Sequence, residues 1–306
     1  MRAKAIVKIC ICGTIALVLA SMLVSLLALP RVLDWKIGDL SFHWIDDHGG
    51  DEGYTVGEAS VSGEVRELDV SWLSGSVTVE LTDGDAVTLR EEPQPESSDA
   101  RMRWKLQDGK LTVYSQKSGL TIPTRAKQLT IGIPAGRAGK LQKLSLDLSA
   151  ATASLPALTL RELELDSVSG SVTLTGGAYE KLDFDSTSGD LTLTSAAVGE
   201  LSADTTSGSL TLDGAFETID FDTTSGALHL TASALPRDIS CDTVSGGVTL
   251  TLPENGGFSA TLDSVSGDLA VDGFAGSLHR DEFVYGQGGP AYEFDSVSGD
   301  VRICCA

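Results

Sequence analysis

The sequence has few basic residues, few aromatic residues and little histidine. Its 306 residues include 22 Lys and Arg against 43 Asp and Glu, which gives a formal net charge of −21. Nucleic acids and anionic lipid head groups are bound through basic surfaces, so this acidity argues against both as partners. There are four histidines, and aromatic residues make up 6 % of the chain. We therefore expect a core of small and β-branched residues and no chemistry that depends on histidine.

The sequence also lacks the usual signatures of catalysis and of metal or cofactor binding. It contains no G-x-S-x-G, H-E-x-x-H, P-loop or Rossmann glycine pattern. Its cysteines form neither a disulfide framework nor a metal-ligand spacing. Cys241 has a core-like position, whereas Cys304 and Cys305 are expected to lie on a frayed chain end, where they either link two chains or stay reactive. We predict a protein that is not an enzyme, with no catalytic residues, cofactor or metal.

The first long apolar run predicts a membrane anchor. Residues 9–29 are almost entirely apolar, and a helix of this length spans roughly 30 Å, the thickness of a bilayer core. Arg2, Lys4 and Lys8 precede it, and the first acidic residue is Asp34. By the positive-inside rule, residues 1–8 stay cytoplasmic and the rest of the chain is exported. A cleaved signal peptide ending near Ala28 is the alternative. We expect a single-pass cell-membrane protein with its C-terminal part outside the cytoplasm.

The exported part divides into three predicted regions. Residues 30–58 are acidic and rich in glycine, which indicates a linker. Residues 59–143 alternate apolar and polar side chains with a period of two, which predicts short β-strands. Residues 144–306 contain a repeat, and they also hold 25 of the acidic residues against 5 Lys and Arg. The acidity of the chain is therefore concentrated in the repeat region.

The repeat is a five-residue motif, Asp-Ser/Thr-x-Ser-Gly, that occurs seven times. Successive copies are 18 to 21 residues apart, except that the last follows after 32. An apolar residue precedes each Asp, and apolar residues stand two and four positions after each Gly. Because the apolar period breaks across the motif, the chain must turn there, and we expect the glycine to supply the backbone freedom with a positive φ. The glycines are Gly170, Gly189, Gly208, Gly226, Gly246, Gly267 and Gly299.

Units of about 20 residues with two short strands cannot bury a face alone and must stack on their neighbours. The prediction is an all-β fold, a parallel β-solenoid of about seven rungs of 19–21 residues. Like side chains of adjacent rungs would lie about 4.8 Å apart. A β-propeller is a weaker alternative, because its blades need roughly 40 residues each.

The aspartates of the motif would form a ladder along the solenoid. We expect each carboxylate to accept hydrogen bonds from the backbone N–H groups of its own corner, with the Ser/Thr hydroxyls assisting. Calcium binding is the weaker alternative, since stacked carboxylate oxygens suit a hard cation but the Gly-Gly-x-Gly-x-Asp pattern of calcium-binding β-rolls is absent. The residues concerned are Asp166, Asp185, Asp204, Asp222, Asp242, Asp263 and Asp295.

The long final spacing marks the one irregular segment of the repeat region. It contains His279, Arg280, Phe283 and Tyr285, and Tyr292 follows shortly after. One interpretation is a binding loop with aromatic faces and mixed charge. The favoured interpretation is a cap that covers the unpaired strand edge at the end of the stack.

With these motifs, the chain resembles a bacterial family described as "putative adhesins", domain of unknown function 4097, whose members are named β-strand repeat-containing proteins. The resemblance rests on the repeats, on Leu129-Thr-Ile-Gly-Ile-Pro134 and on Gly109-Lys-Leu-Thr-Val113, and it covers residues 59–301. It implies a non-catalytic role outside the cytoplasm, since members often follow a single membrane helix and some lie in operons for envelope stress response. No functional residues carry over from it.

Two classes of function follow. The first is binding: adhesion to, or sensing of, a cell-envelope or surface component. The second is a structural surface scaffold that forms homo-oligomers through the ends of the solenoid. A glycan-active enzyme is a remote third alternative, because a β-solenoid fold alone does not imply activity.

Overall fold

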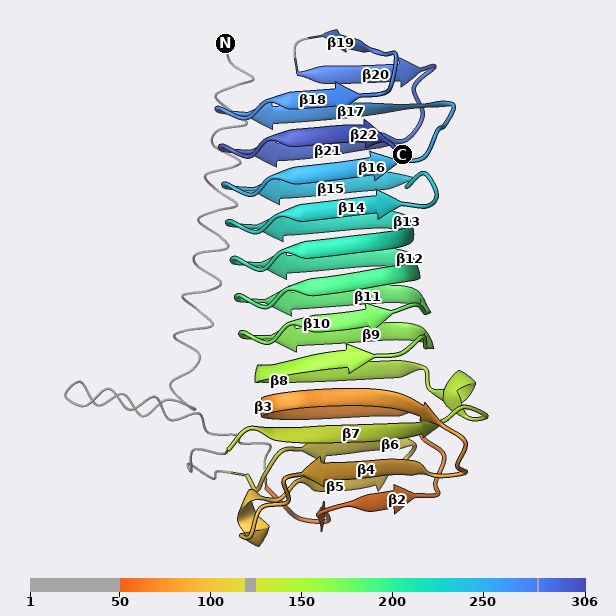
Figure 1. Cartoon of the computed structure of the whole chain (residues 1–306), viewed down its shortest axis with the longest axis vertical. Coiled ribbons are helices and arrows are strands. Elements are labelled where there is room, and N and C mark those ends of the chain that lie inside the picture. Colours follow the sequence, from red (N-terminus) through yellow and green to blue (C-terminus); the bar gives the residue numbers. More distant parts are fainter. Residues whose placement is uncertain (1–49, 119–124, 280) are drawn as a thin grey trace, which may run out of the picture.

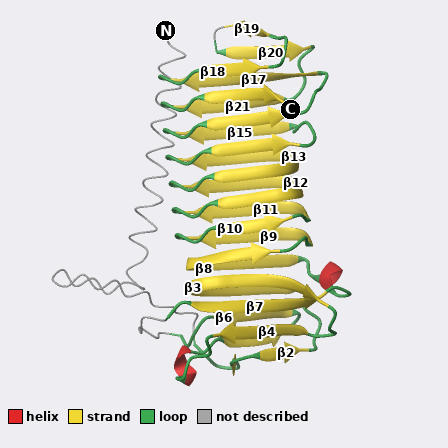
Figure 2. Cartoon of the chain, in the orientation of Figure 1, coloured by secondary structure: helices red, strands yellow, loops and turns green. Residues whose placement is uncertain are grey.

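The computed structural model describes residues 50–118, 125–279 and 281–306, which form one elongated stack of β-strands (Figure 1). Helical structure in this part is limited to two short 3-10 turns, η2 (Ser98–Ala100) and η3 (Ala138–Lys140), shown red in Figure 2. None of the helices in the described ranges has the length and hydropathy of a membrane span. The predicted cytoplasmic segment 1–8, the anchor 9–29 and most of the linker 30–58 lie outside these ranges.

The repeat region forms rungs of two strands that pair in parallel with the next rung. β9 (Thr159–Ser167) and β10 (Val172–Thr175) make one rung, and β11 (Ala178–Ser186) with the first part of β12 (Leu191–Thr205) makes the next. Each repeat pairs with its neighbour at the same motif position, so that Asp166 faces Asp185 and Val172 faces Leu191. This confirms the predicted all-β, solenoid-like fold. The stack continues through β13 (Leu210–Thr223), β14 (Leu228–Ala232), β15 (Asp238–Thr243) and β16 (Val248–Leu252).

The core is a column of apolar side chains between the two strand layers. Along each strand, alternate residues point inward, as in Leu163 and Leu165 of β9 or Leu182 and Phe184 of β11, and they are almost completely buried. Each such side chain contributes about 1.5–3 kcal/mol through the area it removes from water. Cys241 is one of these core residues, as predicted.

The final repeat does not lie at the end of the stack. β21 (Ala291–Ser296) and β22 (Val301–Cys305) pair with β15 and β16 on one side, and with β17 (Gly257–Ser264) and β18 (Leu269–Asp272) on the other (Figure 1). The chain therefore passes the end of the stack and returns to insert its last rung one level inside. Cys304 and Cys305 accordingly lie in a paired strand and are half-buried, so the expectation of a frayed chain end is wrong.

The excursion between the last two repeats forms a cap, as favoured from the sequence. β19 (Ser277–His279) and β20 (Glu282–Gly286) are antiparallel to each other, and β20 is also antiparallel to β17. The free edge of β17 is thereby covered.

The N-terminal end has a similar arrangement. β3 (Glu67–Thr82) pairs in parallel with β8 (Lys143–Leu155) on one side and with β6 (Lys110–Tyr114) and β7 (Lys127–Pro134) on the other. The antiparallel strands β4 (Val87–Glu92), β5 (Arg103–Gln107), β2 (Ala59–Val61) and β1 (Thr55–Val56) close this end. The strands before the sequence repeat are thus paired continuously with those of the repeat.

Candidate functional site

The repeated corner is held by the hydroxyl that follows each Asp, not by the Asp itself. In most copies the glycine N–H donates to this hydroxyl, for example Gly170 to Ser167 Oγ at 2.9 Å and Gly226 to Thr223 Oγ1 at 2.8 Å. At Gly208 the Thr205 hydroxyl instead donates to the glycine carbonyl at 2.9 Å. Among the described residues, none of the motif carboxylates bonds to its own corner, so the expected aspartate cap is wrong. The constant Ser/Thr at this position was the signal in the sequence.

The corner glycines are required by close approach between rungs. The described residues with positive φ include none of the seven corner glycines, which corrects the expected conformation. A Cβ built at Gly208 would lie 2.0 Å from Gly189 O, and one built at Gly226 would lie 1.9 Å from Gly208 O. Six of the corner glycines face the carbonyl of the corner glycine in the adjacent rung, and Gly170 faces the carbonyl of Ala151. A side chain at any of these positions would therefore collide with backbone atoms of the neighbouring rung.

The motif aspartates project outward and form a continuous in-register ladder. The order in space is Asp147, Asp166, Asp185, Asp204, Asp222, Asp242, Asp295 and Asp263. Asp147 belongs to this ladder although its motif, Asp147-Leu-Ser-Ala-Ala151, lacks the glycine and escapes recognition in the sequence.

Partial burial, together with the charges of neighbouring acids, raises the pKa values of most of these carboxyl groups. Partial burial, followed by the charges of Asp185, Asp147 and other neighbouring acids, raises the pKa of Asp166 to about 6. Burial and the neighbouring Asp242 and Asp204 raise the pKa of Asp222 to about 7. Burial also raises the pKa values of Asp147, Asp185, Asp204, Asp242 and Asp295. The ladder therefore retains protons that isolated aspartates would lose.

The geometry gives calcium binding by the ladder no specific support. The closest grouping of possible metal-ligating oxygens in the described chain lies beside the ladder, at Glu162, Glu164 and Asp183. Lys143 already occupies this group, with its ammonium 3.3 Å from Glu162. It also forms an ion pair with Glu164, whose pKa is lowered mainly by that hydrogen bond. Because Lys143 pairs with two of its three carboxylates, this group is a salt-bridge cluster rather than a cation site.

The two outward faces of the solenoid differ in chemistry. Next to the aspartate ladder, a second column contains Glu164, Asp183, Ser202, Asp220, Ser240 and Glu293. The opposite layer carries an almost uncharged column in register, formed by Thr173, Thr192, Thr211, His229 and Thr249. These side chains are exposed or half-exposed. The molecule thus has an acidic face and a threonine face, both repeated at the rung spacing.

The predicted binding loop is mostly part of the cap core. Phe283 and Tyr292 are buried and Tyr285 is half-buried. All three rings pack on Phe258, with centroid distances of 5.7–5.9 Å. His279 is exposed in β19, and Arg280 lies outside the described residues. The aromatic residues therefore do not form an accessible binding surface.

The N-terminal cap holds a buried ion pair that the sequence did not reveal. Lys127 Nζ lies 2.7 Å from Glu91 Oε1, and both side chains are nearly inaccessible. Trp72 donates its indole N–H to Lys127 O at 3.1 Å, and the ammonium lies 5.0 Å from the Trp72 ring centroid. Glu91 also accepts the Met102 N–H. The pair is enclosed by β3, β4 and β7 and acts in the packing of this cap.

Comparison with known families decides the identity of this architecture. A family model described as Toastrack DUF4097 matches residues 65–304, which span β3 to β22. The chain belongs to the Toastrack family. The match confirms the resemblance seen in the repeats. It begins just before β3, after β1 and β2, and it includes the inserted final rung of the Toastrack domain.

Solved structures resemble this Toastrack domain at low sequence identity. A "Putative lipid binding protein" from Parabacteroides distasonis aligns with a TM-score of 0.51 and 16 % identity, over 84 % of this chain and 98 % of its own. A "putative adhesin" from Bacteroides fragilis aligns with a TM-score of 0.48 and 13 % identity, over 83 % of this chain and 98 % of its own. No curated protein matches the chain. At 16 % identity, the similarity to the Parabacteroides distasonis protein shows the fold alone.

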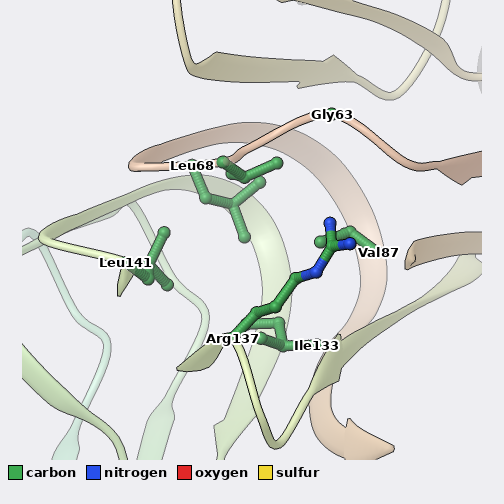
Figure 3. A pocket seen from close by; sticks show the side chains of 7 residues that line it. Gly63, Leu68, Val87, Ile133, Arg137 and Leu141 are labelled. Carbon is green, nitrogen blue, oxygen red and sulfur yellow. The ribbon is translucent and has the colours of Figure 1, made fainter. Parts of the chain in front are cut away.

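Neither of two cavities in the described Toastrack domain matches an enclosed small-molecule pocket, because one is very small and the other is open. One, beside η3, is lined by Gly63, Val65, Leu68, Val87, Ile133, Arg137 and Leu141, most of which are labelled in Figure 3. Its volume of about 20 Å³ is enough for a single water. A larger depression of about 510 Å³ near Glu80 and Arg90 is open to solvent. Neither cavity is lined by a nucleophile paired with a base. We therefore take the long outer faces, rather than these cavities, as the candidate binding surfaces.

Proposed function

We propose that this Toastrack protein is a non-catalytic binding module of the cell envelope, held by residues 9–29 and displayed outside the cytoplasmic membrane. Its ligand is an extended glycan of the envelope or of a neighbouring surface, and the threonine face is the binding surface. Adhesion and envelope sensing both use such a contact.

The observation that carries this proposal is the in-register threonine column on an otherwise acidic molecule. Thr173, Thr192 and Thr211 present the same hydroxyl and methyl groups at each rung. A polymer with repeating sugar units can repeat one weak contact along such a face, and the contacts add through high effective concentration. The acidic face disfavours phosphate-rich or carboxylate-rich polymers by charge repulsion. The name "Putative lipid binding protein", given to one structural neighbour, agrees with a binding role.

The test is co-sedimentation of the detergent-solubilised full chain with insoluble cell-wall glycan, followed by competition with glycan oligomers of increasing length. We expect affinity to rise with oligomer length. Thr211→Glu and Thr249→Glu should reduce binding at least tenfold together, because they place charge on the threonine face. Ser202→Glu and Ser240→Glu, on the acidic face, are the matched controls and should leave binding unchanged. Absence of binding, or equal loss in both pairs, would refute the proposal.

A further inference from the structure

A regular series of backbone hydrogen bonds joins the rungs, and the last donor in this series, at the C-terminal end of the stack, has no rung to bond to among the described residues. The first residue of the second strand of each rung donates its N–H to the next rung in space. The series is Val172 to Asp190, Leu191 to Ser209, Leu210 to Ala227, Leu228 to Gly247, Val248 to Asp300 and Val301 to Asp268, at 2.8–3.0 Å. Leu269 is the next member, since it pairs in register with Val301. In the described part of the chain no rung lies beyond it.

The C-terminal cap leaves this edge open. β20 pairs with β17, whereas β22 is the one described strand that pairs with β18 (Figure 1). Val301 donates to the Asp268 carbonyl, so Asp268 and, by alternation along the strand, Ala270 face β22. Leu269 and Val271 therefore direct their N–H and C=O groups away from the stack. An unpaired row of this kind is a template for another strand.

The side chains along this edge are also incompletely covered. Leu269 and Val271 are only half-buried, whereas their counterparts one rung inside, Val301 and Ile303, are 3 % and 0 % exposed. Val265, at the corner that leads into β18, is 58 % exposed. An added strand would bury these apolar groups in the same way that each inner rung buries its neighbour.

The charge around the edge selects the type of strand. Asp268 directly precedes β18, and Asp263, Asp281 and Glu282 are exposed on the other strands and turns at this end of the stack. Arg302 is already paired with Asp272, at 2.8 Å. A second copy of the chain would bring the same acids to the contact, and like charges placed opposite each other are unfavourable. A basic strand would instead meet complementary charge.

We propose that the free edge of β18 binds an extended peptide segment of alternating apolar and basic residues by strand addition. Main-chain hydrogen bonds to Leu269 and Val271 provide the register, and the apolar residues of the segment pack beside those two side chains. The basic residues lie against the surrounding carboxylates. This contact is independent of the threonine face.

The probe is a fluorescent nonapeptide of alternating Val and Lys with blocked termini, titrated against the detergent-solubilised full chain and followed by anisotropy. We expect saturable binding that weakens with salt and is at least tenfold weaker when Glu replaces Lys. Peptides N-methylated on alternate residues test the backbone contact directly. Methylation along one edge of the peptide should abolish binding, and methylation along the other edge should preserve it.

Two protein variants locate the site. Val271→Pro removes an outward N–H while leaving the groups that face β22, and it should weaken binding about tenfold. Val61→Pro, on strand β2 of the opposite end, is the control and should not change it. Equal effects of the two variants, equal binding of the Glu peptide, or insensitivity to N-methylation would overturn the proposal. So would a dimer in sedimentation that Val271→Pro dissociates, since the occupant would then be a second copy.

Discussion

Gly208→Ala tests how the rungs are packed, because it adds a single methyl group at the centre of the stack. That Cβ would lie 2.0 Å from Gly189 O and 3.0 Å from Gly189 C. Both atoms belong to the backbone, so no side-chain rotation relieves the contact. The two rungs must separate locally by about 1 Å to reach a normal Cβ contact distance, which is overpacking in the strict sense.

The expected cost can be estimated from the bonds that this separation strains. Ser207 N–H donates to Thr187 O at 3.0 Å, directly beside the contact, and the Thr205 hydroxyl donates to Gly208 O at 2.9 Å. Each hydrogen bond contributes about 1 kcal/mol, and overpacking adds about 1–3 kcal/mol. We expect the free energy of unfolding to fall by about 3–5 kcal/mol.

The assay is urea unfolding followed by circular dichroism. Gly136→Ala is the matched control, because a Cβ there meets nothing within 4 Å and its φ is not positive. It should change stability by no more than about 0.5 kcal/mol. Thr211→Val, outward on the next strand, should be similarly mild or slightly stabilising. Damage in a repeat array can also split the transition into two. If Gly208→Ala unfolds at the same midpoint as Gly136→Ala, the close-approach argument is wrong.

Three further predictions rest on the fold and a fourth on the N-terminal sequence. Because the stacked aspartates, such as Asp222, have raised pKa values, the native state keeps protons that the unfolded chain loses between about pH 4 and 7. The free energy of unfolding should fall by on the order of 1 kcal/mol from pH 5 to pH 8, after allowance for solvent exposure. A higher free energy of unfolding at pH 8 than at pH 5, measured by urea unfolding, would contradict this. Lys127→Ala leaves Glu91 buried without a counter-charge and should lower the free energy of unfolding by about 3–5 kcal/mol. Lys110→Ala, at a more exposed ion pair, is the control and should lower it by less than about 1 kcal/mol in the same urea measurement. Truncation after Pro290 removes the inserted rung and should make β17 and β18 exchange their amide protons rapidly while β9 to β12 stay protected. N-terminal sequencing of membrane-extracted protein should find residues 9–29 retained, and a start near residue 30 would show cleavage.

The local pattern of this sequence was sufficient to predict the architecture. The motif from Asp166 to Gly170 and its later copies predicted parallel rungs in register, because apolar residues alternate on both sides of a fixed corner. The long spacing before Asp295 predicted a cap, because it contains more residues than a rung of normal length can hold. These features depend on residues close together in the chain, which is why they can be read without the fold.

The tertiary structure decided the order of the rungs and the role of each corner residue. Equivalent repeats pair equally well with any neighbour, so nothing local indicates that Asp295 lies between Asp242 and Asp263. The need for glycine arises from a carbonyl about 19 residues away, at Gly189 for Gly208, and is indistinguishable in sequence from a need for positive φ. The same distance in sequence hid Asp147, whose register is visible only through β9, and the burial of Lys127 beside Glu91. Contacts between segments far apart in the chain leave no periodic signal, so only the packed stack reveals them.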